Sequence, residues 1–582
     1  MDSKMDSPTT LRNRMLEVVS KNGGHLASSL GAVEIAMALA EVFDPAKDRV
    51  VWDVGHQAYA WKLLTGRDNR FDTLRKLGGI SGFPNPSESV ADAAVAGHAG
   101  VALSVAAGFA AARDRKGTDE NVIAVVGDAA MANGVSFEAL NHCAAATSKF
   151  IVVLNDNEMS ISRPTGSFAR LLGRLITGVR YNRVKMAAEK AGHALRLTFL
   201  RGIYHSIERR VKSLFLGNAF FEQFGLRYIG PIDGHDLAAL KDAFTVAKED
   251  KRSVLVHVVT KKGHGYAPAE KNPTKWHGVG PFELFPKDGD ERIVASKRGW
   301  SDAFGDALCE LAREDDRIVA LTAAMKDGTG LCGFASEFPG RFFDVGIAEE
   351  HMVAFASGIA AGGLRPVVAV YSTFLQRAVD QVMHDVCLTR QPVVFCVDRA
   401  GVVGADGATH QGVFDIAMLR CLPNLTICQP KDEADLKALL REALVRNGPT
   451  VIRYPRGAAP AKVEAVPCVA PGEAASVAIW ATGDWLAKAN EVARLVGGCE
   501  VVHARYLKPF DAELLSRQRK AGMTIVSLEN GSVSGGFGEE IGADLKFGWP
   551  DEFIPHGTQS ELEAKYGLDA ASVASAIKSR RA

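Results

Sequence analysis

Two short apolar runs that end in polar residues constrain the fold of this 582-residue chain more than any other feature. Residues 122–126 (VIAVV) lead into Gly127 and Asp128, and residues 150–154 (FIVVL) lead into NDN at 155–157. Short runs rich in β-branched residues are typical of strands that are buried on both faces. The segment between them has helical spacing, so the whole stretch predicts a βαβ unit with two parallel, neighbouring strands.

The polar residues at the ends of these two strands are suited to hold a metal ion. The carboxyl ends of parallel strands meet at one edge of a sheet, where open α/β sheets bind their ligands. We therefore expect Asp128 and Asn157 to lie close together. A carboxylate and an amide oxygen suit Mg²⁺, which takes few protein ligands and completes its octahedron with waters and phosphate oxygens. The pattern predicts a site for Mg²⁺ and a diphosphate, although a strand-end aspartate alone can equally cap the following helix.

Composition places the chain among ordinary globular proteins. Hydrophobic residues make up 47% of the chain. Its 68 basic residues balance its 68 acidic ones, so the chain has no net positive charge that would attract nucleic acid or an anionic membrane. The nine cysteines form no C-x-x-C pair, which favours a reducing compartment over a disulfide framework. Residues 1–10 lack an apolar signal core, and residues 93–112 are uncharged but too rich in Ala and Gly to insert into a bilayer. We expect a cytoplasmic protein that acts on small molecules, without nucleic-acid or membrane partners.

Strand and helix patterns alternate along the chain, which predicts an α/β fold of three doubly wound domains. Further strands are expected at 50–52, 254–259, 318–321, 342–345, 366–370, 393–397, 477–480 and 524–528. Stretches rich in Pro, Gly, Ala or charge at 281–297 and 457–475 indicate linkers. The expected domains are therefore 1–297, 298–465 and 466–582. The pattern assigns no role to the basic, helical region 163–224.

Longer motifs give the chain a specific resemblance. They are GHLASSLG (24–31), WDVGHQAY (52–59), LNDNEMSIS (154–162), YIGPIDGHD (228–236), YSTFLQRAVDQV (371–382), DRAGVVGADGATHQG (398–412) and RYPRG (453–457). Over nearly its whole length the chain resembles the 1-deoxy-D-xylulose-5-phosphate synthases, thiamine-diphosphate enzymes of the transketolase superfamily. Runs of this length discriminate far better than a lone glycine pattern. The resemblance implies the transketolase-like fold, with a thiamine diphosphate/Mg-binding domain, a pyrimidine-binding domain and a C-terminal domain in that order.

The resemblance also implies how the cofactor is held. The metal ligands would be Asp128, Asn157 and the backbone carbonyl of Met159. Thiamine diphosphate would contact the matching cofactor positions, which are His56, His98, Gly127, Asp128, Ala129, Asn157 and Phe374. The two histidines would lie beside the diphosphate and the thiazolium. Phe374 would pack on the pyrimidine, although an aromatic residue at this spacing could equally be core.

Thiamine chemistry further needs a buried carboxyl that shares a proton with the pyrimidine N1′. The resemblance assigns this role to Glu349, and an apolar slot would raise the pKa of this carboxyl enough for the exchange. The alternative is a surface glutamate at a helix N-terminus. Glu350, which stands where the family usually has Gln, complicates the choice. His25, His277 and His410 match further active-site histidines, which are able to move protons.

Two arginines point to a phosphorylated acceptor. Arg399 and Arg456 lie in loops that follow expected strands, and guanidinium forks suit a phosphate dianion. In the family these positions, with Tyr371, bind the phosphate of glyceraldehyde 3-phosphate. Asp406 and His410 match residues that contact the hydroxyl and carbonyl oxygens of the acceptor. Arg377 could meet the pyruvate carboxylate or form a surface ion pair.

The implied activity is that of a transferase. It would condense pyruvate with D-glyceraldehyde 3-phosphate to 1-deoxy-D-xylulose 5-phosphate and CO₂, the first step of the non-mevalonate isoprenoid pathway, whose product also serves thiamine biosynthesis. A homodimer is expected on the same ground. Two alternatives stay open: a transketolase-like carboligase with another donor or acceptor, and a catalytically degenerate homologue. They are motivated by Ala129, where the family has Gly, and by the segment 99–102, where the family is rich in serine. A Cβ at residue 129 would crowd the diphosphate if that position needed a positive φ or a close backbone approach.

Overall fold

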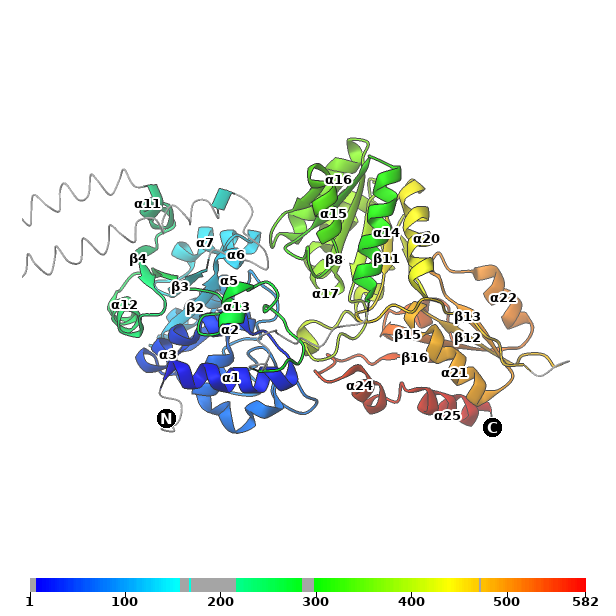
Figure 1. Cartoon of the computed structure of the whole chain (residues 1–582), viewed down its shortest axis with the longest axis horizontal. Coiled ribbons are helices and arrows are strands. Elements are labelled where there is room, and N and C mark those ends of the chain that lie inside the picture. Colours follow the sequence, from blue (N-terminus) through cyan, green and yellow to red (C-terminus); the bar gives the residue numbers. More distant parts are fainter. Residues whose placement is uncertain (1–6, 158–166, 169–215, 285–297, 470–472, 582) are drawn as a thin grey trace, which may run out of the picture. The chain divides into compact units, whose positions relative to one another are not determined.

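The part of the chain that the structure describes folds into two compact units that together contain three sheets. The computed structural model describes residues 7–157, 167–168, 216–284, 298–469 and 473–581 (Figure 1). The first unit comprises the described residues within Met1–Leu74 and Gly79–Val294, and the second those within Arg75–Gly78 and Ala295–Ala582. One sheet lies in the first unit and two lie in the second.

The sheet of the first unit has five parallel strands in the order β1-β2-β3-β5-β4. These strands are β1 (Arg49–Asp53), β2 (Val122–Gly127), β3 (Ile151–Asp156), β4 (Arg227–Asp233) and β5 (Val254–Val259). Successive side chains of a strand face opposite sides of a sheet. In β2, Ile123 and Val125 enter one hydrophobic cluster, while Ala124 and Val126 enter another. The sheet therefore has an apolar core on each face.

Helices cover both of these faces (Figure 1). On the first face lie α1 (Pro8–Asn22), α2 (Ala27–Gly31), α3 (Val33–Val42), α4 (Tyr59–Lys62) and α12 (Leu237–Glu249). On the second face lie α5 (Ala102–Lys116), α7 (Gly134–Ala146) and α11 (Leu216–Gln223). Polar side chains fix several helix starts: Ser7 accepts from the backbone of Thr10 at α1, and Asn133 from that of Val135 at α7. The result is a doubly wound α/β layer structure.

The second unit contains a large and a small sheet. The large sheet has the order β14-β10-β11-β9-β8-β6-β7 and is parallel except for the antiparallel pair of β10 and β14. The small sheet has the parallel order β13-β12-β15-β16. The strands are β6 (Ile318–Thr322), β7 (Phe342–Asp344), β8 (Arg365–Tyr371), β9 (Val394–Asp398), β10 (Thr426–Cys428), β11 (Thr450–Arg453), β12 (Val477–Ala481), β13 (Cys499–His503), β14 (Tyr506–Lys508), β15 (Thr524–Ser532) and β16 (Leu545–Trp549).

Helices also cover both faces of these two sheets. On the large sheet they are α14 (Trp300–Glu314) and α20 (Glu433–Val445) on one face and α16 (Glu349–Ala361) on the other. On the small sheet they are α21 (Leu486–Val496) and α25 (Ala570–Arg581) on one face and α22 (Ala512–Lys520) and α23 (Phe537–Glu540) on the other. One hydrophobic cluster contains Val368 of the large sheet together with Trp480 and Ile525 of the small sheet. The two sheets therefore share a core.

The observed sheets confirm the predicted fold class, and each expected strand is present. Strand ends are shifted by at most two residues, except that β15 continues four residues beyond the expected end at 528. Six strands were not expected: β4, β10, β11, β13, β14 and β16. The domain boundaries stay predictions. Most of region 163–224 and most of the expected linker at 281–297 lie outside the described residues.

No helix in the parts of the chain that the structure describes combines the length and the apolar character needed to cross a membrane. The uncharged stretch 93–112 instead runs from an irregular segment into α5. The small side chains of α5 pack in the core beside Val122 and Ala124 of the sheet.

Candidate functional site

Polar residues gather at the carboxyl edge of the first sheet. Gly127 of β2 is level with Asn155 of β3, so Asp128 stands level with Asp156, and Asn157 lies one residue further along. The carboxyl groups of residues 128 and 156 are both buried. The structure thus brings the two sequence-predicted metal ligands, Asp128 and Asn157, to neighbouring strand ends. Met159, the third expected ligand, lies outside the described residues.

The electrostatic setting of Asp128 fits a cation. Burial, together with the negative charge of Asp156, raises the pKa of Asp128 to about 8. Lys262, which follows β5, opposes this shift, and burial lowers its own pKa to about 8. Two neighbouring carboxylates and an amide oxygen at a buried edge suit a hard divalent ion, which would relieve the repulsion between the acids. These residues therefore fit Mg²⁺, and the ammonium of Lys262 suits an anionic group beside it.

Ala129 does not strain this edge. It lies in the short helix α6 (Asp128–Met131) and is not among the non-glycine residues with positive φ. One of the two conditions for crowding by its Cβ, a left-handed backbone, is therefore not met. At Gly127 an added Cβ would meet no heavy atom closer than the carbonyl oxygen of Asp53, at 3.8 Å.

Three histidines of the first unit form one cluster. The ring centroids of His25 and His56 are 5.5 Å apart, those of His25 and His277 are 5.5 Å apart, and those of His56 and His277 are 4.9 Å apart. Burial lowers the pKa of His277 well below its usual value, and the charge of Lys262 adds to the effect. His277 is therefore neutral at physiological pH and able to accept a proton. Because Lys262 acts on both His277 and Asp128, the cluster adjoins the acidic edge.

The segment that carries His98 is tied to the end of β1. It spans residues 79–101 and contains no helix or strand. The N–H of Gly55 donates to the carbonyl of Ala96 at 2.8 Å. The carboxylate of Asp53 accepts from the N–H of Gly100 at 2.9 and 3.0 Å and from that of Ala102 at 3.0 Å. These bonds keep His98 near the strand end from which His56 follows.

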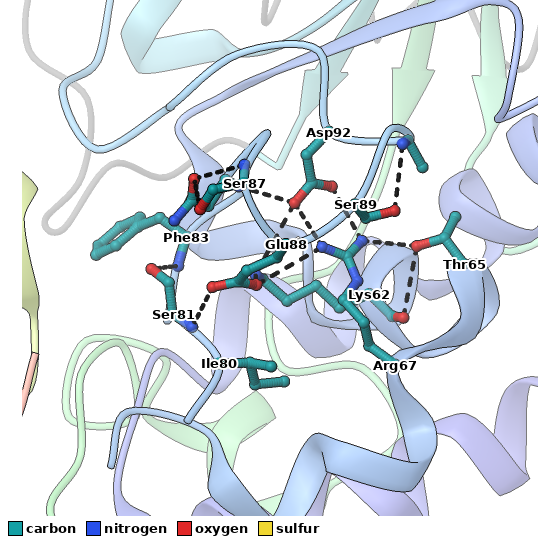
Figure 2. A network of polar contacts seen from close by, with 12 residues as sticks. Lys62, Thr65, Arg67, Ile80, Ser81, Phe83, Ser87, Glu88, Ser89 and Asp92 are labelled. Atoms are coloured by element: carbon teal, nitrogen blue, oxygen red, sulfur yellow. Dashed lines mark hydrogen bonds and ion pairs between the residues drawn. The ribbon is translucent and has the colours of Figure 1, made fainter. Parts of the chain in front are cut away.

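A buried ionic network fixes residues 81–92 of the same segment, as Figure 2 shows. Nζ of Lys62 lies 2.7 Å from Oε2 of Glu88, and the guanidinium of Arg67 contacts both oxygens of Asp92 at 2.5 and 3.0 Å. The same two carboxylates accept backbone N–H groups of the segment at 2.6 and 2.8 Å. Lys62, Arg67 and Asp92 are almost fully buried. The segment is therefore fixed by paired charges rather than by regular secondary structure.

In the second unit, Glu349 is buried at the first position of α16, with only 3% of its surface exposed. The alternative of a surface glutamate is therefore wrong. Burial raises the pKa of Glu349, and the positive charge of Arg377 opposes the shift. Nη1 of Arg377 lies 3.2 Å from Oε2 of Glu349, so this arginine forms a largely buried ion pair instead of one at the surface. The neighbouring Glu350 is half-buried.

Two arginines concentrate positive charge beside Tyr371. The guanidinium carbon of Arg399 lies 3.8 Å from the centroid of the Tyr371 ring. Nη1 of Arg456, whose side chain is 45% exposed, lies 3.2 Å from Oδ2 of Asp406, and the charges of both arginines act on Tyr371. Arg399 also has a φ of +58°, a left-handed backbone that non-glycine residues adopt rarely. Neighbouring guanidinium groups of this kind favour an anion.

Phe374 packs between two other residues that the sequence singled out. It lies in α17 (Ser372–Leu375), with its ring centroid 5.7 Å from that of Tyr371 and 5.5 Å from that of His410. Nδ1 of His410 lies 2.8 Å from Oγ1 of Thr409. The expected acceptor-binding residues thus lie at the end of β8 and in the loops that follow β9 and β11.

Three charged residues of these sites escaped the sequence reasoning. Lys262 follows an expected strand and Asp156 ends one. The rule that ligands bind at the carboxyl ends of parallel strands would therefore have found both residues. Arg75 had no such signal. It lies in the loop that belongs to the second unit, has a positive φ, and its Nη1 lies 2.7 Å from Oδ1 of Asp406.

The chain matches models of three known domains. Residues 4–260 match the model described as 1-deoxy-D-xylulose-5-phosphate synthase, residues 296–462 the transketolase pyrimidine binding domain, and residues 469–573 the transketolase C-terminal domain. With the three observed sheets, these matches define a transketolase-like enzyme.

Two similar proteins identify the family within this class. The 1-deoxy-D-xylulose-5-phosphate synthase 1 of Geobacter metallireducens is 46% identical over 98% of this chain and 95% of its own length. The 1-deoxy-D-xylulose-5-phosphate synthase 2 of Geobacter sulfurreducens has the same identity and the same two coverages. The chain belongs to the 1-deoxy-D-xylulose-5-phosphate synthase family. A crystal structure of transketolase from Campylobacter jejuni, 18% identical over 99% of both chains, superposes with a TM-score of only 0.44, and this likeness carries no weight.

Proposed function

We propose that this chain condenses pyruvate with D-glyceraldehyde 3-phosphate to give 1-deoxy-D-xylulose 5-phosphate and CO₂, the first step of the non-mevalonate isoprenoid pathway. Near-full-length identity of 46% to named synthases carries the proposal. The enzyme is a transferase that depends on thiamine diphosphate and Mg²⁺. When bound, thiamine diphosphate supplies the nucleophilic carbon and the electron sink for the loss of CO₂.

The first unit would hold the cofactor's charged end. We assign Mg²⁺ to Asp128, Asn157 and the backbone carbonyl of Met159. The buried, mutually repelling carboxylates of residues 128 and 156 support this assignment. His56, His98, Gly127 and Ala129 would line the diphosphate. The ties between the segment 79–101 and β1 would keep His98 in place.

The second unit would supply the proton that activates the cofactor. Burial keeps the pKa of Glu349 raised, so its carboxyl can share a proton with a ring nitrogen, while Arg377 keeps the charged form accessible. Phe374 would pack on the pyrimidine. From the first unit, His25 and His277 would move protons, and the lowered pKa of His277 suits it to accept one.

The charges beside Tyr371 would select the acceptor. Arg399 and Arg456, with the Tyr371 hydroxyl, would bind the phosphate of glyceraldehyde 3-phosphate. Asp406, which lies against Arg456, and His410 would contact the acceptor's hydroxyl and carbonyl oxygens. Arg377 would meet the pyruvate carboxylate from its position beside the buried carboxyl.

We further propose a homodimer and a cytoplasmic location. Large apolar side chains are exposed around α16, and a partner subunit would bury them. They are Phe343, Leu364, Met383 and Leu388. All nine cysteines are free, which agrees with a reducing compartment. We also propose that the chain has three domains, at residues 1–297, 298–465 and 466–582.

A product assay tests the activity. Purified protein with Mg²⁺, thiamine diphosphate and both substrates should form the ketose phosphate, and should release CO₂ far faster with the aldehyde than without it. Absence of ketose phosphate would refute the proposal. Faster turnover with a ketose phosphate donor than with pyruvate would favour a different carboligase. The degenerate alternative is not favoured, because an inactive scaffold has no physical need to keep Asp128, Asn157 and the buried Glu349 together.

A further inference from the structure

Two cysteines face each other at the edge of the small sheet. Cys499 begins the edge strand β13, and Cys468, in the stretch before β12, forms an isolated antiparallel bridge with it. The backbone N–H of each cysteine donates to the carbonyl of the other, at 2.8 and 2.9 Å. Residues paired in this way have Cα atoms about 5.5 Å apart and side chains on the same face. A disulfide spans Cα separations of about 4.4–6.8 Å, so the backbone already lies within range.

We propose that Cys468 and Cys499 form a reversible oxidation site, at which a small-molecule disulfide converts the two thiols into an intrachain disulfide. Both cysteines pack in the same hydrophobic cluster, and the charge of a Cys468 thiolate acts on Cys499. Cys468 is partly exposed, whereas Cys499 is fully buried. A reagent in solution therefore meets Cys468 first.

The geometry favours a labile bond rather than a permanent structural one. Directly opposite residues of a hydrogen-bonded pair have Cβ atoms up to about 5.5 Å apart. The Cβ atoms of a relaxed disulfide are about 3.8 Å apart. Closing the bond therefore requires the stretch that carries Cys468 to move toward β13, and a strained disulfide is more easily reduced. Burial raises the pKa of Cys499 to about 11, so this thiol reacts slowly with outside reagents and acts second.

The reaction is thiol–disulfide exchange. The Cys468 thiol loses its proton, and its sulfur attacks one sulfur of the reagent R–S–S–R, which gives a mixed disulfide and releases the first R–SH after protonation. The Cys499 thiol then loses its proton and attacks the Cys468 sulfur, which releases the second R–SH. The protein loses two electrons and two protons, and the reagent gains them. A dithiol reverses both steps.

Peptide mapping of the full-length protein after treatment with oxidised glutathione tests the proposal. After alkylation of free thiols and digestion, we expect a peptide pair joined through Cys468 and Cys499. Its mass should be that of the two thiol peptides less two hydrogens, and it should disappear on reduction with dithiothreitol. The Tm should be higher for oxidised than for reduced protein, because a cross-link constrains the unfolded chain. A stable glutathione adduct on Cys468 with Cys499 alkylated, or no modification of Cys468, would overturn the proposal.

Matched variants separate this pair from the other cysteines. Cys468→Ser should abolish both the joined peptide and the redox-dependent shift in Tm. Cys421→Ser should keep both, because Cys421 is exposed and lies outside the pair. Should Cys468→Ser fold poorly, Cys468→Ala gives the same comparison. A shift in Tm that persists in either variant at residue 468 would contradict the assignment.

Discussion

Nη1 of Arg377 lies 3.2 Å from Oε2 of Glu349, and both side chains are largely buried. The guanidinium stabilises the charged carboxylate, whereas burial favours the neutral acid. The pKa of Glu349 is raised, so burial has the larger effect. A carboxyl on which these two effects oppose each other can both hold and release a proton. That is the property a proton exchange with a heterocyclic nitrogen requires.

Replacing this carboxyl should separate cofactor binding from turnover. We predict that Glu349→Gln lowers kcat by about 10²–10⁴-fold, the usual contribution of general acid–base catalysis. Thiamine diphosphate binding, measured by calorimetry with Mg²⁺, should change only a few-fold. Glu350→Gln is the matched control and should keep near-normal turnover. A collapse in Glu350→Gln with near-normal turnover in Glu349→Gln would move the role to the neighbouring residue.

The paired arginines predict a selective effect on the phosphorylated substrate. Arg456→Ala should raise the KM for glyceraldehyde 3-phosphate about 10–100-fold, because a hydrogen bond to a charged group contributes about 1.5–3 kcal/mol. The KM for pyruvate should change much less. Steady-state kinetics with each substrate varied in turn measures both constants. Arg313→Ala, which removes an exposed ion pair with Glu337, serves as the control. Equal rises in both KM values would refute the phosphate assignment.

The buried network beside α4 predicts a large loss of stability from one truncation. Glu88→Ala leaves Lys62 buried without its closest counter-charge, which should cost about 3–5 kcal/mol in the free energy of unfolding. Equilibrium denaturation in urea measures the loss. Asp119→Ala, which removes the exposed partner of Lys47, should leave the midpoint almost unchanged. An equally small effect of Glu88→Ala would show that the network does not hold the segment.

Sequence patterns predicted the central strands because parallel strands that are buried on both faces produce continuous apolar runs. The edge strands β7 and β14 and the short strand β10 have only three residues each, which is too short for a reliable pattern, and of these only β7 was expected. The strand-end rule located Asp128 and Asn157 because register follows from strand pairing. Contacts between residues far apart in the sequence, such as Lys62 with Glu88 or Arg75 with Asp406, have no local pattern. They become visible only once the chain is folded.

Glu529 predicts a specific dependence of stability on pH. Its carboxyl is fully buried in β15 and accepts the N–H groups of Phe537 and Gly538 at 2.7 and 2.8 Å. Burial raises its pKa from 4.5 to about 7. Because the folded state binds the proton more tightly than the unfolded state, this contribution is fully present below pH 4.5 and is lost as the pH rises through about 7.

Comparison with Glu529→Gln isolates that contribution, because the amide does not titrate. Between about pH 4.5 and pH 8 the unmodified protein should lose up to about 3 kcal/mol of stability relative to the variant, at about 1.4 kcal/mol per pKa unit. Urea denaturation of both proteins at several pH values measures the difference. Parallel pH profiles would contradict the raised pKa.

Calorimetric titration of thiamine diphosphate into the protein, with and without Mg²⁺, tests the central claim most directly. The unmodified protein should bind the cofactor only when Mg²⁺ is present, because Mg²⁺ held by Asp128 and Asn157 would offset the repulsion between the acidic sheet edge and the diphosphate. Asp128→Ala should lose this metal-dependent binding, whereas Glu349→Gln should retain it. Full affinity in Asp128→Ala, or equal affinity in the absence of Mg²⁺, would contradict a metal-bridged cofactor at the ends of β2 and β3.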